Sequence, residues 1–310
     1  MSDDLSSEKL QGVCGLYTKA VKWLTIGDII AEDIVKNGKT IVKSETPVSL
    51  RIILKLQANG VQYVKVKNSP FLTDHHSVYM AENTVSSEFV QEIIYDFLIN
   101  NNKNYRYSYF LKTKEAVDTI TNMVENVSVN ENAKNLLSAL KLWDIYCFNH
   151  VVDVFIIGTL WMHHLKLNPT TEDGIGFLLH DIGKIRIPRE ILLKEDNLPY
   201  HEFELLKKHT VYGAEILEKF NFSKKICEMA KYHHVRMNRT GYPKPYPKEL
   251  SLHVKILMIV DSFSAITLDR PYREAHSFRQ GLEILREEKE LYDRELLEQF
   301  VSFIEGQIFR

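Results

Sequence analysis

Histidine and aspartate side chains recur through the second half of the chain, within stretches that are otherwise apolar and helix-like. They are His150, His180, Asp181, His209, His233, His234 and Asp261. Burying so many polar side chains is unfavourable unless something compensates them, and a pair of divalent metal ions would do so. Imidazole and carboxylate groups without a thiolate favour iron, manganese or another first-row ion over a structural zinc site. The set predicts a metal-dependent hydrolase, or a protein derived from one.

The residues differ in how strongly each one indicates a metal. A lone histidine such as His150, in an apolar helix, is more often a hydrogen-bonded core residue than a ligand. Asp261 also lies in a strongly apolar helix, where an uncompensated carboxylate would be strongly destabilising. His209 falls on the core-facing stripe of a helix predicted over residues 200–220.

Two adjacent pairs, His180–Asp181 and His233–His234, end helical runs, so both members of a pair can face one cavity. If Asp181 bridges, the seven side chains fill two adjoining coordination spheres. Metal ions about 3.5–4 Å apart would hold a water between them, lower its pKa and stabilise the charge that develops on a phosphoryl group.

Cationic residues follow these side chains along the chain. Lys184 comes three residues after Asp181, and Arg270 and Arg273 follow Asp261 on either side of a proline that is expected to end the helix. Guanidinium groups bind phosphate oxygens in a forked geometry, although surface charges are the alternative reading. Tyr242, in a Gly-Tyr-Pro loop, could contact a base or a phosphate, and a plain turn explains that loop equally well.

The composition fits a protein with a sizeable core and no nucleic-acid polymer as partner. The 310 residues carry a net charge of −2 and are 45% hydrophobic, so no basic surplus is present. Three widely spaced cysteines are expected to be reduced thiols. The N-terminus is polar and acidic, unlike a signal peptide, and the apolar stretch 151–165 is too short to span a bilayer. We therefore expect a cytoplasmic protein with no membrane span.

The first part of the chain reads as a small α+β module. Asn37–Gly38, between two apolar runs, predicts a β-hairpin. A helix is expected over 50–58, ended by Gly60, and a strand over 61–66, while residues 1–20 are expected to be a loose tail.

The rest of the chain reads as helices. Connecting helices are predicted over 116–127 and 131–142 from apolar residues at three- and four-residue spacing. We expect a mainly α protein with two domains: residues 1–136, a regulatory or partner-binding module with its connecting helices, and residues 137–310, an all-α catalytic domain.

Motifs spread over residues 140–300 resemble the HD-GYP family, a branch of the HD metal-dependent phosphohydrolases whose members hydrolyse the bacterial second messenger cyclic di-GMP. The matching motifs are His180-Asp181-Ile-Gly-Lys184, Lys208-His209-Thr-Val-Tyr-Gly213, His233-His234, Gly241-Tyr-Pro243 and the stretch from Asp261 to Arg273. The resemblance implies an all-α HD-type fold, two divalent metals, iron or manganese, and a signalling role.

The resemblance also assigns roles. One metal would take His150, His180, Asp181 and Asp261, and the other Asp181, His209, His233 and His234. Asp181 and Lys184 would act in catalysis, and Lys184, Tyr242, Arg270 and Arg273 would bind substrate. The implied reaction is attack of water on cyclic di-GMP, giving linear pGpG or, in a further step, GMP.

The sequence departs from the family pattern at two places. Tyr146 stands where some members carry a glutamate that holds a third metal, so two metals are expected. The stretch that often reads Glu-Arg-x-Asp-Gly-x before Gly-Tyr-Pro lacks both acidic residues and the glycine, where Arg239 stands. The alternatives are a catalytically weak or inactive nucleotide sensor or protein-interaction module, with partners bound through the N-terminal module or the Gly-Tyr-Pro loop, and a hydrolase of another phosphodiester.

Overall fold

The computed structural model describes residues 16–21, 24, 29–36, 38–48, 52, 55–56, 58–67, 106–194, 196–269 and 275–308. The chain divides into two compact units, Met1–Thr84 and Val85–Arg310. The first unit is a small β-containing module and the second is helical in its described residues. Each is described by itself below.

The N-terminal unit contains a three-stranded antiparallel sheet and a separate hairpin. The sheet has the order β1-β5-β2, and the strands are β1 (Leu16–Ala20), β2 (Ile29–Ile30) and β5 (Tyr63–Lys67). The predicted hairpin is confirmed as β3 (Ile34–Lys36) and β4 (Lys39–Val42), with Gly38 in the left-handed region at φ 73°. The expectation of a loose tail over residues 1–20 was wrong for β1, because Leu16 pairs with Lys67 and the strand adds an edge to the sheet.

The described part of the second unit consists of helices. In chain order they are α3 (Arg106–Phe110), α4 (Lys114–Ser128), α5 (Glu131–Trp143), α6 (Ile145–His164), α7 (Thr171–Leu179), the 3-10 helix η3 (Ile182–Arg186), α8 (Arg189–Leu192), α9 (Tyr200–Lys207), α10 (His209–Lys219), α11 (Lys224–Tyr232), α12 (Leu252–Thr267), α13 (Phe278–Glu287), the 3-10 helix η4 (Lys289–Leu291) and α14 (Arg294–Ile308). A long connection, residues 233–251, joins α11 to α12. Polar side chains cap several N-termini, as Thr113, Asn130 and Asp144 do for α4, α5 and α6. The expected mainly α fold with a small α+β module is confirmed.

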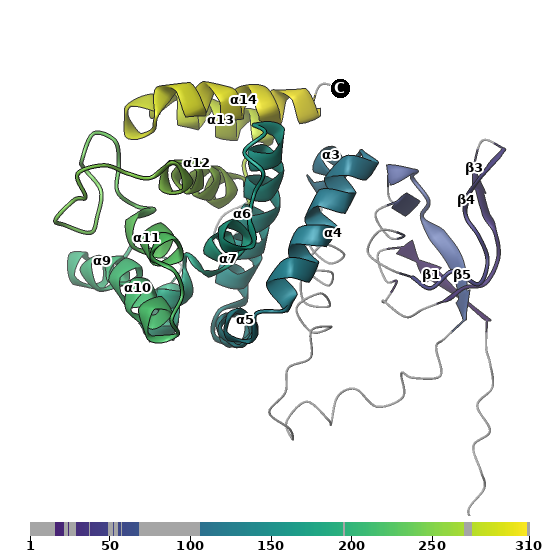
Figure 1. The fold of residues 1–310 in the computed structure, drawn as a ribbon, viewed down its shortest axis with the longest axis horizontal. Helices are drawn as coiled ribbons and strands as arrows, with labels where there is room; N and C mark the ends of the chain where they lie inside the picture. Colours follow the sequence, from purple (N-terminus) through teal and green to yellow (C-terminus); the bar gives the residue numbers. More distant parts are fainter. Residues whose placement is uncertain are drawn as a thin grey trace, which may run out of the picture. The chain divides into compact units, whose positions relative to one another are not determined.

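Helix α6 is the centre of the helical unit and packs against α4, α5, α7 and α12 (Figure 1). It is apolar on nearly all sides and buried over most of its length, as expected of a core helix. By length and composition alone, its 20 residues would suffice to span a membrane. The apolar stretch 151–165 considered in the sequence analysis is shorter than this helix. Neighbouring helices cover its apolar surface.

The helix predicted over 200–220 is two helices, α9 and α10, divided at Lys208. The Lys208 amide donates to the carbonyl of Leu205 at 3.1 Å, a tighter turn than the α-helical one. His209 is therefore the first residue of α10, and its ring lies beside the end of α9.

Along the chain, the division between the compact units falls after residue 84, whereas the sequence analysis placed the domain boundary between residues 136 and 137. Helices α4 and α5 belong with the helical unit because their apolar faces pack on α6 and α7. Val117, Ile120, Leu137 and Leu140 are buried in that contact layer. The regulatory role expected of the N-terminal part stays a prediction.

Candidate metal centre

The ends and faces of five helices bring the seven predicted side chains together. His150 comes from α6 and Asp261 from α12, while the others stand at helix termini of α7, α10 and α11. Two groups have ligand atoms within 4.8 Å of one another: His150, His180 and Asp181, and His209, His233 and His234. All are buried except His234, which is half-buried. The structure thus groups the side chains as two potential ion sites.

Three of the histidines are oriented in the same way. The Nδ1 atoms of His180, His209 and His233 lie 2.8, 2.7 and 2.8 Å from the carbonyl oxygens three residues earlier, those of Phe177, Leu206 and Ala230. A carbonyl oxygen only accepts, so each Nδ1 carries the proton and donates. Each Nε2 is then left with its lone pair directed into the centre, which is the form that binds a metal.

The two carboxylate oxygens of Asp181 face different groups of histidines. Oδ1 lies 3.2 Å from His209 Nε2 and 3.7 Å from His233 Nε2. Oδ2 lies 3.7 Å from His180 Nε2 and 4.0 Å from His150 Nε2. This geometry is what a carboxylate that bridges two ions requires.

Asp261 also spans the two groups. Its Oδ1 lies 2.9 Å from His150 Nε2 and 3.8 Å from His180 Nε2, while its Oδ2 lies 3.9 Å from His234 Nδ1. On the far side of the His150 ring, Nδ1 lies 3.0 Å from the Ser264 hydroxyl. The second carboxylate therefore faces both potential ion sites as well.

Burial sets the charge state of the centre. It lowers the pKa of His180 and, more strongly, of His234, and it lowers the pKa of His233 to about 3, so these imidazoles are neutral at physiological pH. Burial alone would raise the pKa of Asp181, but the Lys184 ammonium together with His180 and His209 outweighs burial and holds that pKa well below its usual range. Neutral imidazoles beside ionised carboxylates are the donor set of a divalent cation.

Two buried atoms without hydrogen-bond partners also indicate that these residues fit a pair of metal ions. His180 Nε2 and Asp181 Oδ1 are buried and have no hydrogen-bond partner among the described residues. Unpaired buried acceptors are costly, and a bound cation would satisfy both of them.

Close backbone packing at Gly183 holds the two groups together. A Cβ atom at Gly183 would lie 1.9 Å from the His209 carbonyl oxygen and 2.4 Å from the Gly213 amide nitrogen. Only glycine therefore lets the turn after Asp181 approach α10 so closely. Gly213 lies on the other side of this same contact.

Lys184 lies at the centre but contacts a carboxylate. Its Nζ donates to Asp181 Oδ2 at 2.6 Å, and it also lines the neighbouring cavity. The ring of Tyr242 stacks on that of His234, with centroids 4.8 Å apart, and burial raises the pKa of the Tyr242 hydroxyl. Arg270 and Arg273, the other expected substrate-binding residues, lie outside the described residues.

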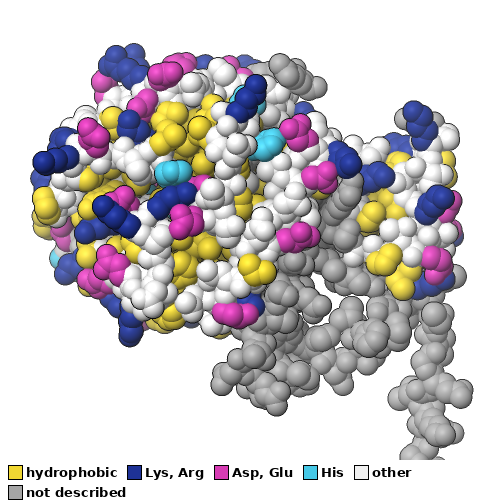
Figure 2. Space-filling view, in the orientation of Figure 1, with side chains coloured by type: hydrophobic (Ala, Val, Ile, Leu, Met, Phe, Trp, Pro, Cys, Tyr) yellow, Lys and Arg dark blue, Asp and Glu magenta, His cyan; other side chains and the backbone are white. Residues whose placement is uncertain are grey.

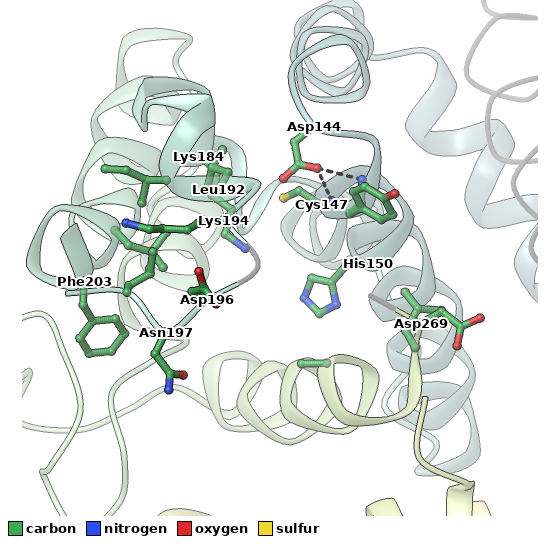
Figure 3. Close-up of a pocket in the computed structure, with 16 residues that line it drawn as sticks. Asp144, Cys147, His150, Lys184, Leu192, Lys194, Asp196, Asn197, Phe203 and Asp269 are labelled. Carbon is green, nitrogen blue, oxygen red and sulfur yellow. Dashed lines mark hydrogen bonds between the residues drawn. The ribbon is translucent and has the colours of Figure 1, made fainter. Parts of the chain in front are cut away.

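A cavity of about 590 Å³ opens beside His150 and Lys184 (Figure 3). The segment between α8 and α9 forms one wall with Lys194 and Asn197, and Phe203 from α9 lines the cavity as well. The sequence analysis did not single out any of the three. The stretch that holds Lys194 and Asn197 is polar and has no helical or strand period, so spacing alone gave no signal there. In Figure 2, one face of the helical unit exposes histidine side chains next to Lys and Arg side chains, with hydrophobic side chains around them.

The loop before the Gly-Tyr-Pro motif keeps an ordered shape despite its altered sequence. Arg239 adopts a left-handed backbone with φ 60°, at the position where the family pattern has glycine. Asn238 replaces an acidic residue, and its Oδ1 accepts from the Thr240 amide and hydroxyl. At Gly241 a Cβ atom would lie 1.9 Å from the His234 carbonyl oxygen, so this glycine fixes the loop against the end of α11.

Comparison with known proteins supports the assignment that this geometry suggests. Residues 114–296 match the HD domain. A cyclic di-GMP phosphodiesterase of Pseudomonas aeruginosa is 30% identical over 206 residues, which are 65% of this chain and 50% of that protein. One of Thermotoga maritima is 38% identical over 136 residues, 43% of this chain and 37% of the relative.

A 3'3'-cGAMP-specific phosphodiesterase of Vibrio cholerae is 37% identical over 111 residues, 36% of this chain and 24% of the relative. The match thus spans half or less of the length of each of these relatives. A helical core with paired histidine and aspartate groups is the architecture of a metal-dependent HD domain. The chain belongs to the HD domain family and, by its motifs and relatives, to the HD-GYP type.

Proposed function

We propose that this protein is a cyclic dinucleotide phosphodiesterase, with cyclic di-GMP as its substrate and linear pGpG as its product. The observation that carries the proposal is the division of the Asp181 oxygens between two groups of histidines. The relatives named as cyclic di-GMP and 3'3'-cGAMP phosphodiesterases support the substrate class.

The proposed ligands are those expected from the family resemblance. His150, His180, Asp181 and Asp261 would hold one ion, and Asp181, His209, His233 and His234 the other. Iron or manganese suits this donor set of imidazole and carboxylate without thiolate. When bound, such a pair lowers the pKa of a water and stabilises negative charge on a phosphoryl group.

The residues around the centre would bind and orient the substrate. The cavity beside His150 would receive the nucleotide, and Lys184 and Lys194 on its walls would attract the phosphates. Lys184 holds Asp181 at 2.6 Å, so a phosphate would compete with the carboxylate for the ammonium group. Tyr242, whose ring packs against His234 at a tilt of 38°, would contact the substrate beside the second ion site.

The proposal is tested by anaerobic hydrolysis of cyclic di-GMP with metal content measured on the same sample. We expect turnover to pGpG by a protein that holds two ions per chain, and loss of both turnover and metal in Asp181→Ala. Full activity of Asp181→Ala would overturn the assignment. A panel of other cyclic dinucleotides and of linear phosphodiesters separates the proposed substrate from its competitors.

A second function is favoured by the loop at 235–240. Arg239 places a charged side chain in a strained backbone where the family pattern has glycine, next to the Gly-Tyr-Pro motif. If the protein holds two metals and binds cyclic di-GMP without turnover over hours, it acts as a nucleotide sensor or as a protein-interaction module. The N-terminal unit or this loop would then provide the contact with a protein partner.

A further inference from the structure

A buried ion cluster lies on the side of His150 that faces away from the proposed metals. The Arg106 side chain, from α3, is 7% exposed, and Asp153, from α6, is fully buried. Arg106 donates from Nε to Asp153 Oδ1 at 2.8 Å and from a terminal nitrogen to Oδ2 at 2.6 Å. The Tyr107 hydroxyl donates to the same carboxylate at 2.7 Å. This bidentate pair is far more constrained than a surface ion pair.

The cluster is connected to the metal centre by Ser264. On α6, Asp153 follows His150 by three residues, and on α12, Thr267 follows Ser264 by three, so the partners share helix faces. Arg106 donates to the Thr267 carbonyl at 2.7 Å. The Ser264 hydroxyl lies 3.0 Å from His150 Nδ1. Burial would raise the pKa of Asp153, but Arg106 and, to a smaller extent, hydrogen bonding from Ser264 lower it, so Ser264 lies between His150 and that carboxylate.

In the structure His150 Nε2 lies 2.9 Å from Asp261 Oδ1 and donates to it, because an ionised carboxylate only accepts. A metal bound at Nε2 would take the place of that proton and leave the ring proton on Nδ1. For His150 to bind through Nε2, its Nδ1 must carry the proton and donate it to the Ser264 oxygen. The Ser264 hydroxyl is then free to donate to Asp153, whose remaining lone pairs accept from Arg106 and Tyr107. A histidine whose distal nitrogen donates toward a carboxylate is a stronger and better oriented ligand.

His150 differs in this respect from three of its fellow ligands. His180, His209 and His233 are oriented by a carbonyl in the preceding turn and need no other element. His150 is oriented by α12 through Ser264 and, behind it, by α3 through Arg106. Its position therefore depends on a helix that supplies none of the proposed ligands.

We infer that Arg106 and Asp153 are positioning residues for His150, which act through Ser264 and make the affinity of the first metal site depend on the docking of α3. The inference rests on the proposed two-metal function. Because outer partners of metal-binding histidines affect affinity by about 10- to 100-fold, weakening is expected at this site alone. The site formed by His209, His233 and His234 does not share these contacts and keeps its ion.

The test measures Mn²⁺ binding by the full chain, as stoichiometry and affinity at controlled free metal, with thermal unfolding of the same samples. The variants are Ser264→Ala, Asp153→Asn and the apolar pair Arg106→Met with Asp153→Leu, since well-packed apolar replacements of a buried ion pair often preserve folding. The control is Asp173→Asn, which disrupts the pair between buried Asp173 and half-buried Lys225 in the first turn of α7, at the end away from His180.

We expect two Mn²⁺ ions in the wild-type protein and in Asp173→Asn. The three variants of the cluster should bind one ion with unchanged affinity and the other about 10- to 100-fold more weakly. The apolar pair should show this weaker binding although its melting temperature stays near that of the wild type. Two ions bound with wild-type affinity in Ser264→Ala and Asp153→Asn would overturn the inference, as would an equal loss in Asp173→Asn. Two ions bound without hydrolysis would remove the proposed function and leave this inference standing.

Discussion

The Nε2 atoms of His209 and His233 lie 3.3 Å apart, and both are acceptors, because each ring donates its Nδ1 proton to a backbone carbonyl. Two lone pairs that face each other in a buried site repel unless a cation or a proton lies between them. Burial lowers the pKa of His233 to about 3, so its own Nε2 does not carry a proton near neutral pH. We therefore expect a bound cation to stabilise the folded protein.

Metal removal is therefore expected to destabilise the helical unit. A ligand at 100 times its dissociation constant stabilises the folded state by about 2.7 kcal/mol, which for a protein of this size corresponds to a change in melting temperature of about 5–10 °C. Thermal unfolding with a chelator, with excess Mn²⁺, and with Mg²⁺ as a control for ionic strength measures the effect. Equal melting temperatures in all three conditions would contradict the prediction.

Single substitutions should distinguish the bridging carboxylate from a ligand of one ion. Asp181→Asn is expected to reduce both metal occupancies, because its two oxygens face separate groups. His209→Ala should affect only the second site, because its ring faces only that group. The affinity losses should be at least about 10-fold, measured by metal titration. If Asp181→Asn lost no more metal than His209→Ala, Asp181 would not bridge.

Gly183 should tolerate no side chain. A Cβ atom there would lie 1.9 Å from the His209 carbonyl oxygen, so Gly183→Ala requires the backbone to move and should destabilise the protein by more than about 3 kcal/mol. Gly306→Ala is the matched control, since a Cβ atom at Gly306 meets nothing within 4 Å and alanine favours the helix by up to about 1 kcal/mol. Urea unfolding of both variants tests the contrast, and similar stabilities would refute it.

Replacing Arg239 with glycine should stabilise the loop before the Gly-Tyr-Pro motif. Arg239 has φ 60°, which is unfavourable for a residue with a Cβ atom by roughly 1 kcal/mol. Asn221→Gly, at φ 58°, is the control and should gain less, because asparagine tolerates this region. Urea unfolding gives the stabilities, and hydrolysis assays on the Arg239→Gly protein show whether the departure from the family pattern limits turnover. A loss of stability in Arg239→Gly would count against a strained loop.

Stability at acid pH should depend on Asp173. Burial would raise the pKa of this carboxyl, but hydrogen bonds from His253, Lys225 and Thr170 outweigh it and lower the pKa below its usual value near 3.8. A carboxyl whose pKa is lower in the folded state stabilises the protein above pH 4, and that contribution is lost as pH falls further. The stability difference between wild type and Asp173→Asn should shrink by more than about 1 kcal/mol between pH 5 and pH 3.

Urea unfolding of metal-free protein at several pH values measures this difference, because removing the metal prevents its release in acid from adding to the effect. The variant Asp33→Asn provides a comparison at an exposed carboxyl, whose pKa is lowered by a hydrogen bond from the Ser44 amide. A stability difference for Asp173→Asn that does not change with pH would rule out the proposed role of the ion pair.

The convergence of the seven histidine and aspartate side chains could be predicted because polar side chains stand out in apolar runs. Asp261 in α12 and His150 in α6 are examples, and periodic apolar residues gave α4 and α5. The hydrogen bonds between Arg106 and Asp153 could not be predicted, because these residues are 47 positions apart and only folding brings them together. The division of α9 from α10 depends on one tight turn at Lys208, which no spacing of apolar residues encodes.

The carbonyls that orient three of the imidazoles belong to the last turns of α7, α9 and α11. A helix leaves its final carbonyl groups without amide partners, and here the Phe177, Leu206 and Ala230 oxygens accept from imidazoles. The places where these helices stop thus determine where the rings point. If one of these helices were a turn longer, its carbonyl oxygen would accept from a backbone amide of the helix and would no longer hold the imidazole. The geometry of the centre thus depends on where the helices end as much as on the histidines themselves.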